Sequence, residues 1–465
     1  MNIAMLLEMA ADGFGDRVAF GSCHDGLTYA RLREIATGVG AHVERIGAHT
    51  VALAHETSPL VPAALFGAAW AGAAYAPLNY RLPDTARAEL LERLEPTAVA
   101  ESLWLEMPVD EGRAFPDEPE RPAVLLFTSG TSAEPKAAVL HHDQLLAYQL
   151  NTVEFASAGE DEAVLVAVPP FHIAGVTAVL SSTYAGRRIV PLARFTAEDW
   201  VSTARGEDVT HAFLVPTMLA RIVAVLEDDP DLELPKLRHL AYGGARMPPP
   251  VLERALHRLP DVGFVNAYGL TETSSTVSVL GPDDHRAALH GDQVARARLA
   301  SVGRPVPGVE VRVLEGEILI RGAQVSGDYV DERSQRDDEG WLHTGDRGRV
   351  DGEGYLFVEG RGDDTIIRGG ENIAPAEVED TLLHHPAVAS AAVVGLPDEE
   401  WGERVVAMVS LRASASASPD ELCEFVRERI GSLKAPESVT VRDELPHTAT
   451  GKILRRQVKA DLEGP

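Results

Sequence analysis

The sequence predicts an α/β fold in which parallel sheets with crossover helices form a large N-terminal domain. The first observation is length, because 465 residues suffice for about two to four structural units. The second is composition: 45% hydrophobic and 24% charged residues are typical of globular proteins and exclude collagen, coiled coils and wholly disordered chains. The third is the alternation of short apolar, β-branched runs with helical patterns.

The alternation is clearest between residues 123 and 259. An apolar run at 123–130 precedes a helical pattern at 140–156, and a second apolar run follows at 162–170. Two further units, at 211–227 and 237–259, each lead from an apolar run into a helix. Because ligands of such sheets bind beyond the carboxyl ends of the strands, we expect the ligand crevice there.

The last third of the chain has a different pattern. Short strands separated by glycine and charged turns, at 308–322 and 340–361, predict a small β-barrel or antiparallel sheet. A polar, glycine-rich segment then precedes a new α+β pattern. We therefore place a domain boundary at residues 361–364, between an N-terminal domain of residues 1–362 and a small C-terminal domain of residues 363–465.

The charge balance restricts the partners. Lys and Arg number 42 against 71 Asp and Glu, a net charge of −29 that would repel nucleic acid and an anionic membrane surface. The uncharged stretch Leu60–Leu78 approaches the length of a membrane span, but Pro62 and Pro77 punctuate it. We predict a buried helix and strand there, and neither a nucleic-acid nor a membrane partner.

Cysteine usage and the N-terminus favour a cytoplasmic location. Cys23 and Cys423 lie far apart and fit neither a disulfide framework nor a Cys-x-x-Cys metal site. The first residues have no basic segment before their short apolar run, which Glu8 interrupts, so they do not resemble a signal peptide. The sequence says nothing of the oligomeric state.

A cluster of hydroxyls, glycine and lysine follows the apolar run that begins at residue 123. Its members are Thr128, Ser129, Gly130, Thr131, Ser132 and Lys136. Backbone N–H groups and hydroxyls donate to phosphate oxygens while lysine adds charge, so the segment suits a polyphosphate. The second glycine of a Walker loop is missing before Lys136. Such a loop alone is more often a solvated turn, so the interpretation depends on the motifs that follow it.

Five further motifs follow in order. They are Gly243-Gly244-Ala245, Asn266-Ala267-Tyr268-Gly269-Leu270-Thr271-Glu272, Thr344-Gly345-Asp346, Gly360-Arg361 and Thr450-Gly451-Lys452. Together with the loop at 128–136, this ordered set resembles the adenylate-forming superfamily of acyl-CoA synthetases, peptide-synthetase adenylation domains and beetle luciferases, and acyl-CoA synthetases most. The resemblance spans residues 128–452 and implies a mobile C-terminal domain.

The resemblance implies a nucleotide site. Tyr268 would stack on adenine, and the other residues around the base would be Gly243, Gly244, Ala245, Asn266 and Gly269. Asp346 would accept hydrogen bonds from the ribose hydroxyls, assisted by Arg361. From the residues alone, Tyr268 could be a capping aromatic, Asp346 a turn residue and Arg361 a solvated side chain.

The resemblance also implies the reacting groups. Glu272, preceded by Thr271, would hold Mg²⁺ together with Thr128, although a carboxylate at that position could merely cap a helix. Lys452 would be the mobile catalytic lysine, unless the basic tail is only a solvated face. His172 would line the acyl pocket or tunnel, and Asp363 would be the hinge.

The implied reaction has two steps. A carboxylate attacks the α-phosphorus of Mg·ATP to give an acyl-adenylate, and the thiol of coenzyme A then displaces AMP. Relatives that activate amino acids carry an Asp shortly after the position of Phe171 to hold the α-amine, and here residues 173–176 contain none. We therefore expect an aliphatic or aromatic acid, and neither an amino acid nor a dicarboxylate. Two alternatives remain: an adenylating enzyme that passes its product to a carrier-protein thiol or another nucleophile, and an inactive binding protein of the same fold.

Overall fold

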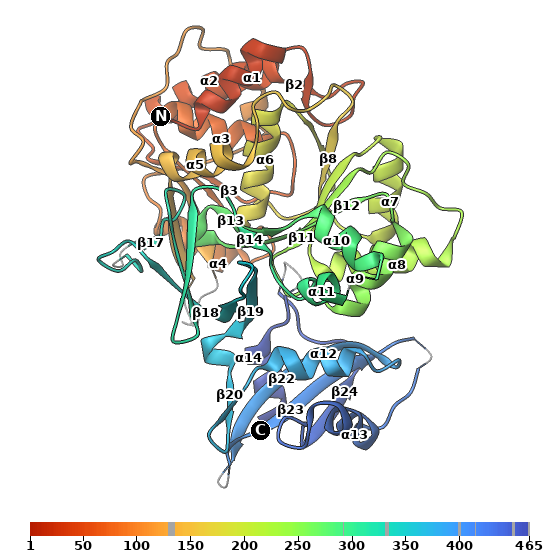
Figure 1. Cartoon of the computed structure of the whole chain (residues 1–465). Coiled ribbons are helices and arrows are strands. Elements are labelled where there is room, and N and C mark those ends of the chain that lie inside the picture. The colour runs from red at the N-terminus through yellow and green to blue at the C-terminus, as the bar shows by residue number, and fades with distance from the viewer. Residues whose placement is uncertain are drawn as a thin grey trace.

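The computed structural model describes residues 1–128, 135–291, 293–330, 334–398, 401–413, 415–448 and 452–463. Within these ranges the strands form four sheets, three of them in the N-terminal part of the chain and one in the C-terminal part. Figure 1 shows the C-terminal part, coloured blue, below the rest of the molecule. The predicted α/β class is confirmed.

The largest described sheet has nine strands. They lie in the order β14 (Arg304–Pro305), β13 (Ser275–Leu280), β12 (Gly263–Leu270), β11 (His239–Gly243), β10 (His211–Leu214), β8 (Ala163–Val166), β9 (Arg188–Pro191), β1 (Val18–Phe20) and β2 (Leu27–Thr28). The strands from β12 to β1 pair in parallel, and antiparallel pairs close both ends. The predicted parallel units at 211–227 and 237–259 are therefore confirmed.

The second sheet has six strands. Their order is β17 (Asp328–Tyr329), β7 (Lys136–His141), β6 (Pro122–Thr128), β4 (Ala74–Pro77), β3 (Thr50–Leu53) and β5 (Thr97–Val99). Here the sequence interpretation was incomplete, because β7 forms an antiparallel hairpin with β6 before the helix that we expected from residue 140. The physical reason is the apolar run 137–140, which is buried in the sheet.

Helices fill the space between these two sheets and cover their outer faces (Figure 1). One hydrophobic core joins strands of both sheets to the helices α1 (Ala4–Phe14), α2 (Tyr29–Arg45), α3 (Leu60–Ala71), α5 (His142–Thr152) and α6 (Ile173–Ala185). A second core packs the nine-stranded sheet against α7 (Ala197–Gly206), α8 (Pro216–Asp228) and α9 (Pro249–Arg258). Shorter elements are α4 (Asp84–Glu92), α10 (Pro282–Leu289), α11 (Gln293–Arg298) and the 3-10 helices η1 (Ser102–Glu106) and η2 (Thr271–Thr273).

The uncharged stretch at 60–78 is a buried helix and strand, as predicted. It forms α3 and β4, and α3 is apolar on all sides because it lies between other helices and the sheet. Among the described residues, no helix combines the length and apolarity that crossing a bilayer requires.

The region of short strands forms a four-stranded antiparallel sheet. Its order is β15 (Val309–Leu314), β16 (Glu317–Gly322), β18 (Leu342–Val350) and β19 (Leu356–Arg361). The Thr344-Gly345-Asp346 motif lies within β18, and Asp346 pairs with Arg361 at the end of β19. This pairing brings two sequence motifs together on adjacent strands.

The C-terminal part begins after the 3-10 helix η3 (Gly362–Asp364). Its sheet contains β21 (Glu371–Ile373), β20 (Ile366–Arg368), β23 (Gly402–Leu411), β22 (Val388–Asp398) and β24 (Ser438–Arg442), with helices α12 (Pro375–Leu383), α13 (Pro419–Ile430) and α14 (Arg455–Glu463). It has a hydrophobic core of its own. The predicted boundary at 361–364 falls on η3, between two sheets that share no strand; whether the parts move about it stays a prediction.

Candidate active site

The phosphate-loop motif is anchored by two strand ends. Thr128 ends β6 and Lys136 begins β7, and the two residues are paired across the hairpin. The Thr128 hydroxyl donates to the Lys136 carbonyl at 3.4 Å. The predicted loop residues Ser129, Gly130, Thr131 and Ser132 lie outside the described residues.

The glycines of two motifs stand where the backbone comes close to other groups. A Cβ on Gly243, at the end of β11, would lie 2.2 Å from the Ala267 carbonyl oxygen of β12. Gly244 has φ of +78°, which a residue with a side chain rarely adopts. Ala245 follows directly, so the turn after β11 runs beside β12, which carries the NAYG motif. Within β12, Gly269 has no room for a Cβ.

Asp346 is the centre of a small hydrogen-bonded group. The Tyr268 hydroxyl donates to Asp346 Oδ2 at 2.6 Å, and Arg361 Nε lies 3.0 Å from Oδ1. Arg361 also donates to the Thr344 carbonyl at 2.7 Å. Burial raises the pKa of Asp346 although Arg361 and Tyr268 oppose the shift. Residues from β12, β18 and β19 thus meet at one point.

Asn266, also predicted near the nucleotide base, is engaged elsewhere. Its amide donates to the Ser301 carbonyl at 3.2 Å. That contact ties β12 to the segment before β14. Asn266 thus lies on the same strand as Tyr268, and its place beside the nucleotide base stays a prediction.

Glu272 lies on η2, directly after β12. Its Oε1 accepts a short hydrogen bond from the Tyr329 hydroxyl, and its backbone carbonyl accepts from Ser326 N at 2.8 Å. The Thr128 hydroxyl interacts with the same Tyr329 hydroxyl. Thr271, at the start of η2, keeps its backbone carbonyl hydrogen-bonded to Ser274 N. The two predicted metal ligands, Glu272 and Thr128, are thus linked through one phenol.

The donor set suits magnesium. A carboxylate and a hydroxyl are hard oxygen ligands, and Mg²⁺ is usually held by one or two carboxylates together with substrate phosphates. Across the described ranges, no group of three or more His, Cys, Asp and Glu side chains could hold a metal by itself. Glu272 and Thr128 therefore fit a metal that also takes ligands from a nucleotide.

Lys452 reaches this site from the C-terminal part. Its backbone is held by Thr448, which accepts from Lys452 N at 3.0 Å and donates its own N–H to the Lys452 carbonyl at 2.7 Å. Lys452 is exposed, yet desolvation by the surrounding protein and the Arg361 charge lower its pKa, whereas Asp346 and Glu272 raise it. The ammonium therefore lies within electrostatic reach of both predicted acidic site residues. Thr450 and Gly451 lie outside the described residues.

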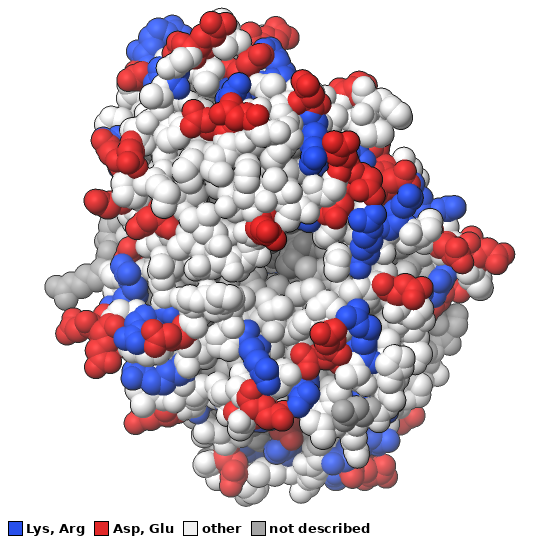
Figure 2. Space-filling view, turned by 45° about the horizontal axis from the view of Figure 1, so that its top comes forward, with Lys and Arg blue, Asp and Glu red and all other residues white. Residues whose placement is uncertain are grey.

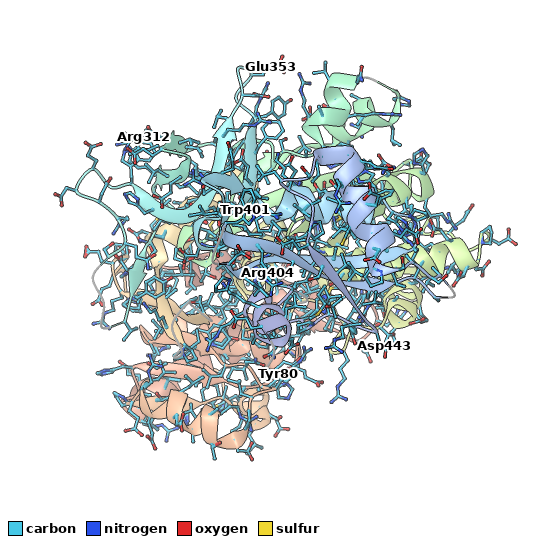
Figure 3. The ribbon with its side chains drawn as sticks, turned by 90° about the horizontal axis from the view of Figure 1, so that it is seen from below. Tyr80, Arg312, Glu353, Trp401, Arg404 and Asp443 are labelled. Carbon is cyan, nitrogen blue, oxygen red and sulfur yellow. The ribbon has the colours of Figure 1, made fainter. Side chains whose placement is uncertain are left out.

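Two ion pairs hold the C-terminal part in this position. Arg246, two residues after Gly244, pairs with Asp380 of α12, and Arg221 of α8 lies 3.7 Å from Glu444. Figure 3, seen from below, shows Trp401 and Arg404 on the C-terminal part in front of the N-terminal part. Neither ion pair was predicted. Arg246 and Asp380 are 134 residues apart, and no local sequence pattern marks such distant residues as partners.

A narrow, mainly apolar pocket adjoins Lys452. It is lined by Val168, Pro169, His172, Phe213, Val215, Met218, Gly244 and Lys452. His172 precedes α6, and its Nδ1 accepts from Ala174 N at 3.2 Å, which caps the helix. Burial, and then the Lys452 charge, lower the pKa of His172 to about 4. The histidine is therefore neutral near neutral pH, as an apolar pocket requires.

The neutral His172 makes stability depend on pH. Its pKa falls from 6.5 to about 4 on folding, so the unfolded chain binds the proton more readily and stability is lost as the pH falls below about 6.5. Asparagine keeps a capping oxygen but cannot be protonated. Between about pH 7.5 and about pH 5, we therefore expect the free energy of unfolding to fall by about 2 kcal/mol less in His172→Asn than in wild type. Urea unfolding at both pH values measures it. An unchanged pH dependence would contradict the buried, neutral state.

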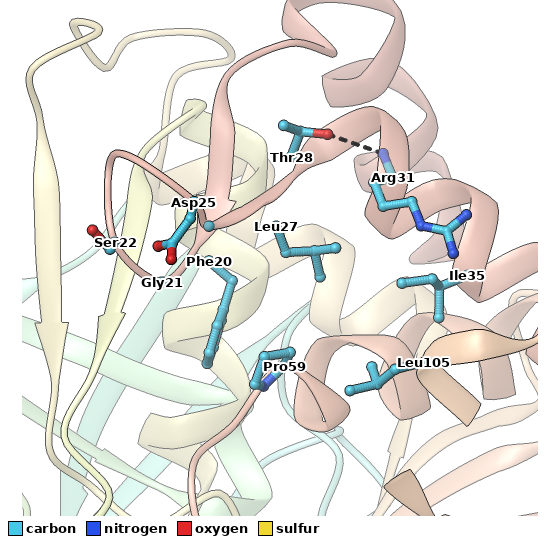
Figure 4. A pocket seen from close by; sticks show the side chains of 11 residues that line it. Phe20, Gly21, Ser22, Asp25, Leu27, Thr28, Arg31, Ile35, Pro59 and Leu105 are labelled. Carbon is cyan, nitrogen blue, oxygen red and sulfur yellow. Dashed lines mark hydrogen bonds between the residues drawn. The ribbon is translucent and has the colours of Figure 1, made fainter. Parts of the chain in front are cut away.

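A second hollow lies far from these residues. It has a volume of about 580 Å³ and lies between the β1–β2 turn, α2 and Pro59 (Figure 4). Of its lining residues only Asp25 and Arg31 carry charge, and Arg31 pairs with Glu34. None of the predicted site residues lines this hollow. We therefore place the active site around Lys452 and not here.

The surface charge indicates that an anionic ligand is bound by cations of the site itself. Figure 2 shows acidic and basic side chains interspersed around one face of the molecule, without a continuous basic area on that face. The net charge is −29. A phosphate ligand would therefore depend on the few cations of the site itself, among them Lys452 and Arg361.

Comparisons with known proteins agree with this geometry. A sequence model of the family described as AMP-binding enzyme matches residues 7–112 and 100–330, and one described as AMP-binding enzyme C-terminal domain matches residues 377–452. A feruloyl-CoA synthase from an Amycolatopsis species is 35% identical over 467 aligned positions, which cover 93% of each chain. A fatty acid–[acyl-carrier-protein] ligase from Streptomyces coeruleorubidus is 34% identical over 365 positions, 73% of this chain and 67% of its own length.

Among solved structures, the o-succinylbenzoate CoA synthetase of Bacillus subtilis has a similar fold. In complex with its acyl-adenylate intermediate it gives a TM-score of 0.83 at 28% identity, covering 98% of this chain and 97% of its own. The same enzyme in complex with ATP and a magnesium ion gives a TM-score of 0.81. The similarity therefore extends over both parts of the chain.

Proposed function

The chain belongs to the AMP-binding enzyme family, and we propose that it is an ATP-dependent acid–thiol ligase that converts a carboxylic acid to an acyl-adenylate and transfers the acyl group to coenzyme A. The resemblance to the adenylate-forming superfamily is thereby confirmed. ATP, Mg²⁺ and coenzyme A are its cofactors and cosubstrates.

One observation carries the proposal. Lys452 comes from the far end of the chain, yet its ammonium lies within reach of Asp346, Glu272 and Arg361, beside an apolar pocket. A cation between a pocket for an acid and a group suited to a nucleotide can stabilise charge that develops on a phosphate during attack. A lysine that only stabilised the fold would not need to lie between the pocket and these acidic residues.

Each residue has a distinct part in the first step. Asp346 accepts from the ribose hydroxyls with Arg361 beside it, and Tyr268 lies against the base with Gly243, Gly244, Ala245, Asn266 and Gly269 around it. Glu272 and Thr128 hold Mg²⁺, which neutralises phosphate charge when bound. Lys452 holds the acid's carboxylate next to the α-phosphate and stabilises the transition state as pyrophosphate leaves.

The acid is an apolar or aromatic monocarboxylate. The pocket offers apolar walls from Val168, Phe213, Val215 and Met218, and its one imidazole is neutral. Apart from Lys452, which takes the reacting carboxylate, the lining residues include no charged side chain for a second carboxylate. Feruloyl-CoA synthase, named for an aromatic acid, supports this class.

The acceptor in the second step is coenzyme A. An alternative is a carrier-protein thiol, which the acyl-carrier-protein ligase of S. coeruleorubidus supports. An inactive protein of the same fold is disfavoured, because the sequence keeps Glu272, Asp346 and Lys452, and the two carboxylates are within electrostatic reach of the lysine.

The test uses the purified chain with Mg·ATP and a library of aliphatic and aromatic acids, with pyrophosphate release as the first readout. Active acids are then incubated with coenzyme A, with an acyl-carrier protein or with no acceptor, and AMP release is followed. We expect apolar acids to release pyrophosphate, and coenzyme A to stimulate AMP release most. Stimulation by the carrier protein alone would favour the alternative, and no pyrophosphate release with any acid would reject the ligase.

A further inference from the structure

Tyr329 lies at the site without belonging to any of the motifs. It is on the two-residue strand β17, which pairs with β7 through Tyr329 and Ala138, and it is only 9% exposed. Val330 N donates to the Ala137 carbonyl at 2.9 Å, directly after it. Because β7 begins at Lys136, the backbone of Tyr329 is fixed to the strand that leaves the phosphate loop.

The Tyr329 hydroxyl meets one of the predicted metal ligands directly. It donates to Glu272 Oε1. A phenolic O–H donates, whereas an ionised carboxylate only accepts, so this hydrogen bond ties one oxygen of Glu272 to Tyr329.

The second oxygen of Glu272 has no such bond to any residue that the structure describes. In the described part of the chain, no other hydrogen bond or ion pair to the Glu272 carboxylate is present besides that from Tyr329. A carboxylate held through one oxygen keeps its rotamer and presents the other oxygen in a fixed direction. Ser326, three residues before Tyr329, fixes the Glu272 backbone in the same way by donating to its carbonyl at 2.8 Å.

We propose that Tyr329 is a positioning residue, which orients the Glu272 carboxylate toward the magnesium ion of Mg·ATP. The proposal rests on the proposed function, because it assumes that Glu272 is a metal ligand. It assigns Tyr329 no contact with substrate, and its effect is exerted through Glu272.

The test measures metal affinity without turnover. Mn²⁺ is titrated by electron paramagnetic resonance into wild type and Tyr329→Phe in the presence of α,β-methylene ATP, which cannot release pyrophosphate. Loss of a group that orients a metal ligand weakens metal binding by about 10–100-fold, and we expect the dissociation constant of Mn²⁺ to rise by about tenfold. Binding of metal-free AMP should be unchanged.

A matched control separates positioning from stability. Tyr75 lies in β4 of the same sheet, is fully buried, and its hydroxyl has no hydrogen-bond partner within the described residues. Tyr75→Phe should therefore leave Mn²⁺ affinity at the wild-type value. Tyr329→Phe should also have no further effect on Mn²⁺ affinity in a Glu272→Gln background, since the group it orients is then already neutral.

The outcomes distinguish the two proposals. Wild-type Mn²⁺ affinity in Tyr329→Phe would overturn the role of Tyr329, as would an additive loss in the double variant. Wild-type protein that releases no pyrophosphate with any acid would instead reject the ligase. A tenfold weaker Mn²⁺ affinity that disappears in the Glu272→Gln background supports the positioning role.

Discussion

Replacement of Lys452 by alanine is expected to abolish most adenylate formation while leaving the thiol step intact. Lys452 lines the apolar pocket and is within electrostatic reach of Asp346, Glu272 and Arg361, so we expect it to contact both the carboxylate and the α-phosphate. Removal of one such preorganised donor costs about 10²–10³-fold in rate. Single-turnover pyrophosphate release should fall by that factor, whereas a preformed acyl-adenylate should still react with coenzyme A at nearly the wild-type rate.

The neighbouring lysine gives the control. Lys459 is on α14, one residue from Val458, which is buried in the small core between α14 and the C-terminal sheet. Lys459→Ala removes the same charge from the same tail and should leave both half-reactions unchanged. Equal damage to the two half-reactions in Lys452→Ala would show that the lysine has a structural role.

The elements and motifs that depend on neighbouring residues were predicted well. Alternation of apolar runs with helical patterns located β10–α8 and β11–α9, because each run and its helix are contiguous in sequence. The close approach at Gly243 explains why glycine marks that turn. These signals are local, so they can be recognised without knowing how distant segments meet.

What the sequence did not reveal depends on distant contacts. The hairpin partner β7 was missed because an apolar run of four residues is too short to distinguish from the start of a helix. Tyr329 and Glu272 are 57 residues apart, and their contact arises only when β17 pairs with β7. Likewise, nothing local marks Arg246 and Asp380 as an ion pair between the two parts of the chain.

If the C-terminal part rotates before the second step, as we predict, this ion pair belongs to the orientation that it leaves. Burial raises the pKa of Asp380 to about 6 although Arg246 opposes the shift. Arg246 and Asp380 must separate if the C-terminal part is to present a different face to a thiol. The resemblance to acyl-CoA synthetases implies that this second face consists of residues 369–373 together with Pro375 and Glu377. Glu377 pairs with Lys434 at 2.7 Å.

Replacement of Asp363 by proline is expected to stop thioester formation while adenylate formation continues. Asp363 lies in η3, between the last strand of the four-stranded sheet and the first strand of the C-terminal sheet. Proline fixes φ near −65°, a value that 3-10 helices adopt, so it is compatible with the present orientation. Within the described residues the Asp363 N–H makes no hydrogen bond that proline would remove. Proline should therefore hold Lys452 at the site and prevent the rotation.

The measurement compares the two half-reactions of Asp363→Pro with those of Asp363→Ala, which leaves φ free. Pyrophosphate release in a single turnover should survive in both variants. Thioester formation should fall by orders of magnitude only in the proline variant, because only proline blocks a change of φ at the hinge. Thioester formation at the wild-type rate in Asp363→Pro would place the hinge elsewhere or show that one orientation serves both steps. Loss of both half-reactions in Asp363→Pro together with a lower melting temperature would indicate misfolding. Asp363→Ala leaves the backbone unrestrained, so its activities show whether the carboxylate itself is needed at this position.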